Sequence, residues 1–126
     1  MSTVKIMVVD DSRVVYAEMS KMLQGSEFEI VAFCRSGEEA LEKYEEVKPD
    51  LVTLDIVMPG MDGLEACEEM RKRWGDANVF MVSSMAYEDM INRAAAMGAK
   101  GFLFKPFNRE DLLTSLRGAM KCIAKE

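Results

Sequence analysis

Short apolar segments alternate along the chain with longer stretches in which apolar residues recur every three or four positions. The apolar segments are typical of buried β-strands, and we expect strands at residues 5–9, 29–34, 51–54, 79–82 and 101–104. The stretches between them have the period of amphipathic helices; in the first, Val15, Met19 and Leu23 fall on one face. The pattern therefore predicts five consecutive strand–helix units.

Capping residues indicate where several of these helices begin and end. Ser36 followed by Glu39 has the spacing of a capping box at the start of the second helix. Asn108 is a favourable N-cap for the fifth helix. The fourth helix is expected to run over residues 87–97 and to end at Gly98, a residue typical of helix C-termini.

Strands that alternate with helices predict an α/β fold in which a parallel sheet is covered on both faces. The length, 126 residues, fits one domain with one core, so we expect a single domain over residues 1–126. Ligands of such open sheets bind beyond the carboxyl ends of the strands. The polar residues that directly follow the predicted strands are Asp10, Asp11, Arg35, Asp55, Ser83, Ser84 and Lys105.

Composition excludes several classes of function. The net charge of −6 argues against direct binding to nucleic acid, and no run approaches the roughly 20 apolar residues of a membrane span. The absence of histidine excludes histidine-based catalysis and histidine–zinc sites. The three cysteines are odd in number and far apart, which indicates reduced thiols in a cytoplasmic protein.

The strand ends carry residues suited to phosphoryl chemistry. Asp10, Asp11 and Asp55 would converge if the first and third strands are neighbours, and a divalent cation such as Mg²⁺ or Mn²⁺ would relieve their mutual repulsion. Lys105 offers a positive charge and Ser83 a hydroxyl, both suited to phosphate oxygens. An aspartate can itself be the nucleophile and form an aspartyl phosphate.

Each of these signals has a simpler explanation when it stands alone. Two adjacent aspartates at a strand end are more often a solvated turn, and a lysine before proline is usually only a turn residue. Ser83 can equally be an N-terminal cap of the fourth helix. The four motifs occur in order, each at its own strand end, and a chance match of all four is a poor explanation.

Across essentially its whole length the chain resembles the receiver domain of two-component response regulators, in particular the stand-alone chemotaxis type. The segments that carry the resemblance are "VVDDS", "PDLVTLDIVMPGMDG", "VSSMA" and "GAKGFLFKPF". The resemblance implies a five-stranded parallel sheet of order 2-1-3-4-5 flanked by five helices, the flavodoxin-like or CheY-like fold. It also implies a single receiver domain without an output domain.

The same resemblance implies the roles of the acidic residues. Asp55 would accept a phosphoryl group from a phosphohistidine on a sensor histidine kinase. Mg²⁺ would be held by Asp11 directly, by Asp10 mostly through water, by Asp55, and by the backbone carbonyl of Val57.

The remaining motif residues would respond to the phosphoryl group. Lys105 would pair with its oxygens, and a cis peptide bond is implied between Lys105 and Pro106. Ser83 would hydrogen-bond the phosphate and draw the following loop inward, while the ring of Phe102, at the aromatic switch position, would turn inward in the active state.

Two positions that often tune the lifetime of the phosphoryl group are apolar in this chain. Val57 lies two residues after Asp55 and Met85 two residues after Ser83, so neither side chain can activate water. Slow self-dephosphorylation is therefore expected; alternatively, both side chains merely cover the mouth of the pocket. Met85, together with Met90, Tyr87 and Phe102, forms either an adaptable partner surface or part of the core.

Taken together, the resemblance implies a phosphorylation-activated signalling switch, a monomer or weak dimer. It would be no enzyme beyond assisting its own phosphorylation and dephosphorylation. Its partners would be a sensor histidine kinase and a downstream protein, such as a flagellar motor switch component. Alternatively, the chain is a phosphorelay intermediate that passes the phosphoryl group to a histidine phosphotransfer protein.

Three rival classes fit the motifs less well. A phosphatase of the haloacid dehalogenase type would carry a second aspartate where Val57 stands, and a flavin phosphate would be repelled by the paired acids after the first strand. A degenerate receiver that only binds proteins would lack an acid or Lys105.

Overall fold

Strands and helices alternate in the computed structural model, which describes residues 3–85 and 87–124. The strands in these described ranges are β1 (Val4–Val9), β2 (Phe28–Cys34), β3 (Leu51–Asp55), β4 (Val79–Ser83) and β5 (Gly101–Phe104). The helices in the same ranges are α1 (Arg13–Leu23), α2 (Gly37–Val47), α3 (Gly63–Arg73), α4 (Glu88–Ala96) and α5 (Arg109–Ala124).

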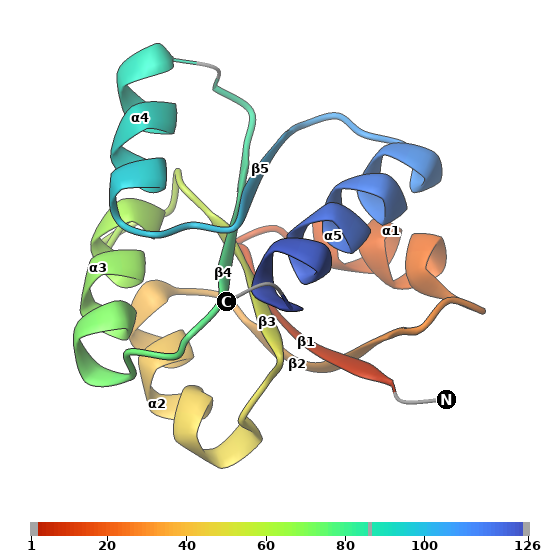
Figure 1. The fold of residues 1–126 in the computed structure, drawn as a ribbon, viewed down its shortest axis with the longest axis horizontal. Coiled ribbons are helices and arrows are strands. Elements are labelled where there is room, and N and C mark those ends of the chain that lie inside the picture. Colours follow the sequence, from red (N-terminus) through yellow and green to blue (C-terminus); the bar gives the residue numbers. More distant parts are fainter. Residues whose placement is uncertain (1–2, 86, 125–126) are drawn as a thin grey trace.

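The strands form one parallel sheet in the order β2-β1-β3-β4-β5, which confirms the α/β fold and the strand order implied by the resemblance. Helices α1 and α5 cover one face of the sheet, and α2, α3 and α4 cover the other (Figure 1). Each face has its own apolar cluster, and because both faces are covered the strands are nearly continuously apolar.

Local side-chain hydrogen bonds explain where the helices begin. Asn108 Oδ1 accepts a hydrogen bond from the Asp111 N–H at 2.7 Å, which confirms the predicted cap of α5. Ser36 Oγ accepts from the Glu39 N–H at 3.1 Å, as a capping box requires. The Glu39 carboxylate, however, accepts from the N–H of Arg35, one residue before the position that the box predicts.

Helix α4 is shorter by one residue at each end than the sequence pattern indicates. Its N-cap residue, Tyr87, forms no side-chain capping bond. Gly98 follows with a φ of 90°, in the left-handed region expected of a glycine just past a helix end.

The cysteines and methionines lie mostly where their spacing predicts. Cys34 and Cys67 are buried and Cys122 is exposed, and all are free thiols. Burial raises the pKa of Cys34 to about 12 and that of Cys67 to about 11, so both thiols are unreactive. Among the described residues, the fully or nearly fully buried methionines are Met7, Met19, Met58, Met70 and Met81.

The helices that the structure describes are too short or too polar to span a membrane.

Thr53 is a polar residue inside β3, and its hydroxyl has no hydrogen-bond partner among the described residues. A buried, unsatisfied hydroxyl is destabilising, whereas an apolar group of the same shape is tolerated. We expect Thr53→Val to raise the free energy of unfolding by about 1 kcal/mol, measured by urea denaturation. Thr114→Val, on the exposed face of α5, is the matched control and should change the value by less than about 0.5 kcal/mol. A loss of stability in Thr53→Val would contradict the prediction.

Candidate functional site

The three aspartates singled out from the sequence lie together at the carboxyl ends of β1 and β3. Asp10 and Asp11 directly follow β1, and Asp55 is the last residue of β3. The two strands are neighbours whose register pairs Val9 with Leu54, which places the acids side by side. One carboxylate oxygen from each lies within 4.8 Å of the others, so the predicted convergence is confirmed.

Lys105 brings a positive charge to this cluster from β5, the strand at one edge of the sheet. It directly follows β5, and its Nζ lies 2.8 Å from Asp10 Oδ2 and 3.3 Å from Asp55 Oδ2. Its backbone N–H donates to the Ser83 carbonyl at 2.8 Å, which ties it to β4. The peptide bond between Lys105 and Pro106 is cis, as the resemblance implied.

The electrostatics of the cluster favour binding of a further cation. Burial and, to a smaller extent, the charge of Asp10 raise the pKa of Asp55 to about 6, although Lys105 and the Val57 N–H act to lower it. Burial would lower the pKa of Lys105, but its hydrogen bond to Asp10 and the charge of Asp55 raise it instead. One lysine thus only partly compensates three carboxylates, two of which are buried.

The residues present fit Mg²⁺. This ion prefers one or two carboxylates together with several waters. Asp10 and Asp55 are buried, whereas Asp11 is exposed, so the cluster combines fixed carboxylates with access to solvent. The backbone N–H of Val57 donates to Asp55 Oδ1 at 3.3 Å, which holds that carboxylate in place. The role of these residues as metal ligands, including the carbonyl of Val57, stays a prediction.

Ser83 ends β4 and is fully buried next to the site. Its Oγ accepts a hydrogen bond from the Met85 N–H at 3.1 Å, and its hydroxyl donates to no acceptor among the described residues. The alternative role as an N-terminal cap is wrong, because Tyr87 occupies the N-cap position of α4. Ser84 is exposed, in keeping with the choice of Ser83 as the functional hydroxyl.

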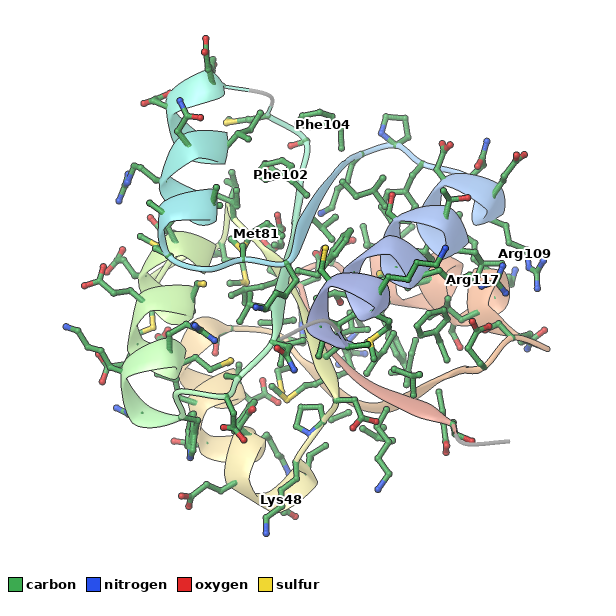
Figure 2. The ribbon with its side chains drawn as sticks, viewed as in Figure 1. Lys48, Met81, Phe102, Phe104, Arg109 and Arg117 are labelled. Atoms are coloured by element: carbon green, nitrogen blue, oxygen red, sulfur yellow. The ribbon has the colours of Figure 1, made fainter. Side chains whose placement is uncertain are left out.

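The predicted switch residue Phe102 belongs to β5, and its side chain packs, partly buried, against the apolar cluster on the face of the sheet that α4 covers. Its ring lies 5.1 Å from that of Phe104 at an interplanar angle of 53°, and Figure 2 shows the two side chains beside α4. Phe104 is exposed, and it lies outside the residues predicted to respond to the phosphoryl group. Residues i and i+2 of a strand share a face, and this alternation was the signal available.

The proposed adaptable surface around α4 is divided between the surface and the core. Met85 and Tyr87 are exposed, which agrees with a contact surface. Met90, in contrast, packs against the apolar cluster together with Phe102, which agrees with the core interpretation.

The loop after Asp55 depends on packing as well as on turn-forming residues. Gly63 is the first residue of α3 and donates its N–H to the Ile56 carbonyl at 2.8 Å. A Cβ at this position would overlap the backbone carbonyl of Asp55. Asp62 Oδ1 caps the helix by accepting from the Glu65 N–H at 2.9 Å.

The contacts of Lys105 lead to a prediction for stability. We expect Lys105→Met to lower the free energy of unfolding by about 2 kcal/mol, because it leaves Asp10 and Asp55 without a counter-charge in a partly solvated site. Added Mg²⁺ should restore part of this loss, as seen by urea denaturation at two metal concentrations. Lys72→Met, at an exposed i,i+4 pair on α3, should cost less than about 0.5 kcal/mol. An equal loss in both variants would contradict the prediction.

Comparison with known proteins identifies relatives over nearly the whole chain. The family described as response regulator receiver domain matches residues 6–117. The chemotaxis protein CheY of Listeria monocytogenes is 43% identical over 93% of this chain and 98% of its own length. CheY of Bacillus subtilis is 38% identical over 89% of this chain and 93% of its own length.

Solved structures show the same similarity. In the CheX–CheY–BeF₃–Mg²⁺ complex from Borrelia burgdorferi, the matching chain has a TM-score of 0.87 and 30% identity, with 96% of this chain and 90% of that chain covered. CheY4 from Vibrio cholerae has a TM-score of 0.81 and 32% identity, with 92% and 98% covered.

Proposed function

The chain belongs to the response regulator receiver domain family, and from this we propose that it is a phosphorylation-activated signalling switch of the chemotaxis type. The observation that carries the proposal is the cluster of Asp10, Asp11 and Asp55 with Lys105 at the carboxyl edge of the sheet. Phosphoryl transfer needs little beyond positioning and charge stabilisation, and this cluster supplies both.

Asp55 is the proposed phosphoryl acceptor. One carboxylate oxygen attacks the phosphorus of the donor, the bond from phosphorus to the histidine nitrogen breaks, and the imidazole leaves with the bonding electron pair. The Nζ of Lys105 lies 3.3 Å from Asp55 Oδ2 before phosphorylation, which is close enough for it to contact the oxygens of the new phosphoryl group. A bound Mg²⁺ would supply the remaining positive charge.

Ser83 couples the phosphoryl group to the loop before α4. A hydrogen bond from its hydroxyl to phosphate would move Oγ, and because Oγ also accepts from the Met85 N–H, the loop would follow. Inward movement of the loop would change the space available to the ring of Phe102, which packs beside α4. The phosphoryl group would thus bias an equilibrium between two arrangements of this face.

The proposed partners are a sensor histidine kinase as donor and a downstream protein that recognises the phosphorylated form. A relative from Borrelia burgdorferi is found in complex with CheX, which supports action through protein contacts. The chain acts on no other substrate in this proposal and assists only its own phosphorylation and dephosphorylation. Transfer from Asp55 to a histidine phosphotransfer protein would instead indicate a relay.

A small phosphoryl donor tests the proposal without a kinase. The protein is incubated with acetyl phosphate and Mg²⁺, and its intact mass is followed, with peptide mapping after reduction of the acyl phosphate. We expect a mass gain of one phosphoryl group, located on Asp55, and no mass gain when a chelator removes the metal before the donor is added. An unmodified protein, or modification on another residue, would overturn the proposal.

The lifetime of the phosphoryl group is a separate prediction. The side chains of Val57 and Met85 are 45% and 40% exposed at the two positions next to the site, so apolar groups stand where a polar residue would orient water. We expect a half-life of minutes or longer after removal of the donor, followed by phosphate release. The double substitution Val57→Asn and Met85→Gln should speed hydrolysis about tenfold, a modest share of what an acid or base group contributes. Equal rates would indicate that these side chains only cover the pocket.

A further inference from the structure

A cavity of about 730 Å³ opens at the end of the sheet opposite the carboxylate cluster, next to the residues that precede β3 and β4. Its volume lies within the range of about 300–1,000 Å³ that is usual for ligand sites. The lining residues are Tyr44, Glu45, Lys48, Pro49, Trp74 and Asp76.

Two stacked aromatic rings form a wall of this cavity. The rings of Tyr44 on α2 and Trp74 after α3 lie 4.4 Å apart at an interplanar angle of 27°. Tyr44 is buried and Trp74 is partly exposed, and both rings belong to or pack against the apolar cluster. The Trp74 indole N–H donates to Glu45 Oε1 at 3.3 Å, which fixes the ring. The exposed part of Trp74 is therefore a preformed surface for a flat group.

The cavity is electrostatically negative. Besides Glu45 it contains Asp76, whose side chain forms no hydrogen bond or ion pair with any other described residue. Burial raises the pKa of Tyr44, the charge of Asp76 raises it further, and Arg71 opposes this with a smaller effect. The guanidinium of Arg71 is engaged by the Ala77 carbonyl at 2.7 Å.

The carboxyl end of helix α2 adds to this negative field. Helix α2 ends at Val47 without a basic residue in its last turn, whereas the last turn of α3, which also ends beside the cavity, carries Arg71, Lys72 and Arg73. One of the lining residues, Lys48, is positively charged. Figure 2 shows its side chain directed away from the body of the protein.

We propose that this cavity binds the guanidinium group of an arginine side chain from a protein partner. A guanidinium stacks on the face of tryptophan and presents a fork of donors to carboxylates, here Glu45 and Asp76, whereas an ammonium lacks the flat face. The net charge of −6 favours approach of a basic segment. Because the cavity is at the amino ends of the strands, a partner anchored there leaves Asp55 accessible.

Trp74 makes the proposal directly testable, because it is the only tryptophan in the chain. The probe is a blocked alanine–arginine–alanine peptide, titrated at constant ionic strength without metal or phosphoryl donor, while the indole N–H signal is followed by NMR. We expect a saturable shift, with the citrulline peptide, which is neutral and nearly isosteric, binding at least about fivefold more weakly.

Charge-neutral variants locate the binding site. Glu45→Gln keeps an acceptor for the Trp74 N–H and removes the charge, and Asp76→Asn removes the other; each should weaken binding about two- to fivefold. Glu42→Gln, an exposed position on α2 outside the cavity lining, is the matched control and should leave binding unchanged. Equal shifts with the citrulline peptide, or an equal loss in Glu42→Gln, would overturn the proposal. Since no phosphoryl group is involved, the result is independent of the switch function.

Discussion

An Asp55→Asn variant will take up no phosphoryl group from acetyl phosphate and Mg²⁺ under conditions in which the unchanged protein is labelled. The amide lacks the anionic oxygen that attacks phosphorus, and the neighbouring carboxylate of Asp10 is engaged by Lys105 at 2.8 Å and by the Ser12 N–H at 2.9 Å. Intact-mass measurement over a time course should show a complete loss of labelling.

The control for this variant makes the same chemical change nearby. Asp62→Asn lies in the same loop and at the N-cap of α3, where asparagine caps as well as aspartate does. It should be labelled at the rate of the unchanged protein. If Asp55→Asn were labelled as fast as Asp62→Asn, Asp55 would not be the acceptor and the proposed function would fail.

Gly63→Ala should be the most destabilising single methyl addition near the site. The new Cβ would overlap the carbonyl oxygen of Asp55 and the Cα of Ile56, both backbone atoms that cannot move without shifting β3. Adding volume to a well-packed position usually costs 1–3 kcal/mol, and backbone overlap belongs at the upper end, so we expect a loss of about 3 kcal/mol. Urea denaturation measures it, and phosphoryl uptake should also fall because Asp55 is displaced.

Gly118→Ala separates this packing effect from helix propensity. Gly118 lies within α5, and a Cβ there would meet no atom within 4 Å. Replacing an exposed glycine inside a helix by alanine should therefore stabilise the protein by about 0.5–1 kcal/mol. A gain in stability for Gly63→Ala as well would show that the loop relaxes around the added methyl group.

The strands and their order along the chain could be predicted because each depends on a local pattern. Predicted strand 51–54 became Leu51–Asp55 and predicted strand 79–82 became Val79–Ser83, so boundaries moved by one residue. In both cases the polar residue assigned to the strand end is itself the last strand residue, because pairing with the neighbouring strand continues to it.

The candidate site was predictable in its members but not in its contacts. Parallel strands carry their carboxyl ends to one edge of a sheet, so Asp10, Asp55 and Lys105 could be grouped from sequence. That Lys105 pairs with Asp10 more closely than with Asp55 required the structure. The neighbouring positions of β1 and β3 came from the resemblance to receiver domains, since hydrophobic periodicity does not determine strand order.

Local patterns identify the elements, their core-facing residues and the acids at the strand ends, because periodicity and capping act over a few neighbouring residues. The contact of Gly63 with the Asp55 carbonyl and the stacking of Tyr44 on Trp74 are visible in the folded chain alone. Both contacts depend on how helices pack, Gly63 of α3 on the end of β3 and Tyr44 of α2 on the end of α3, and no local pattern encodes this packing.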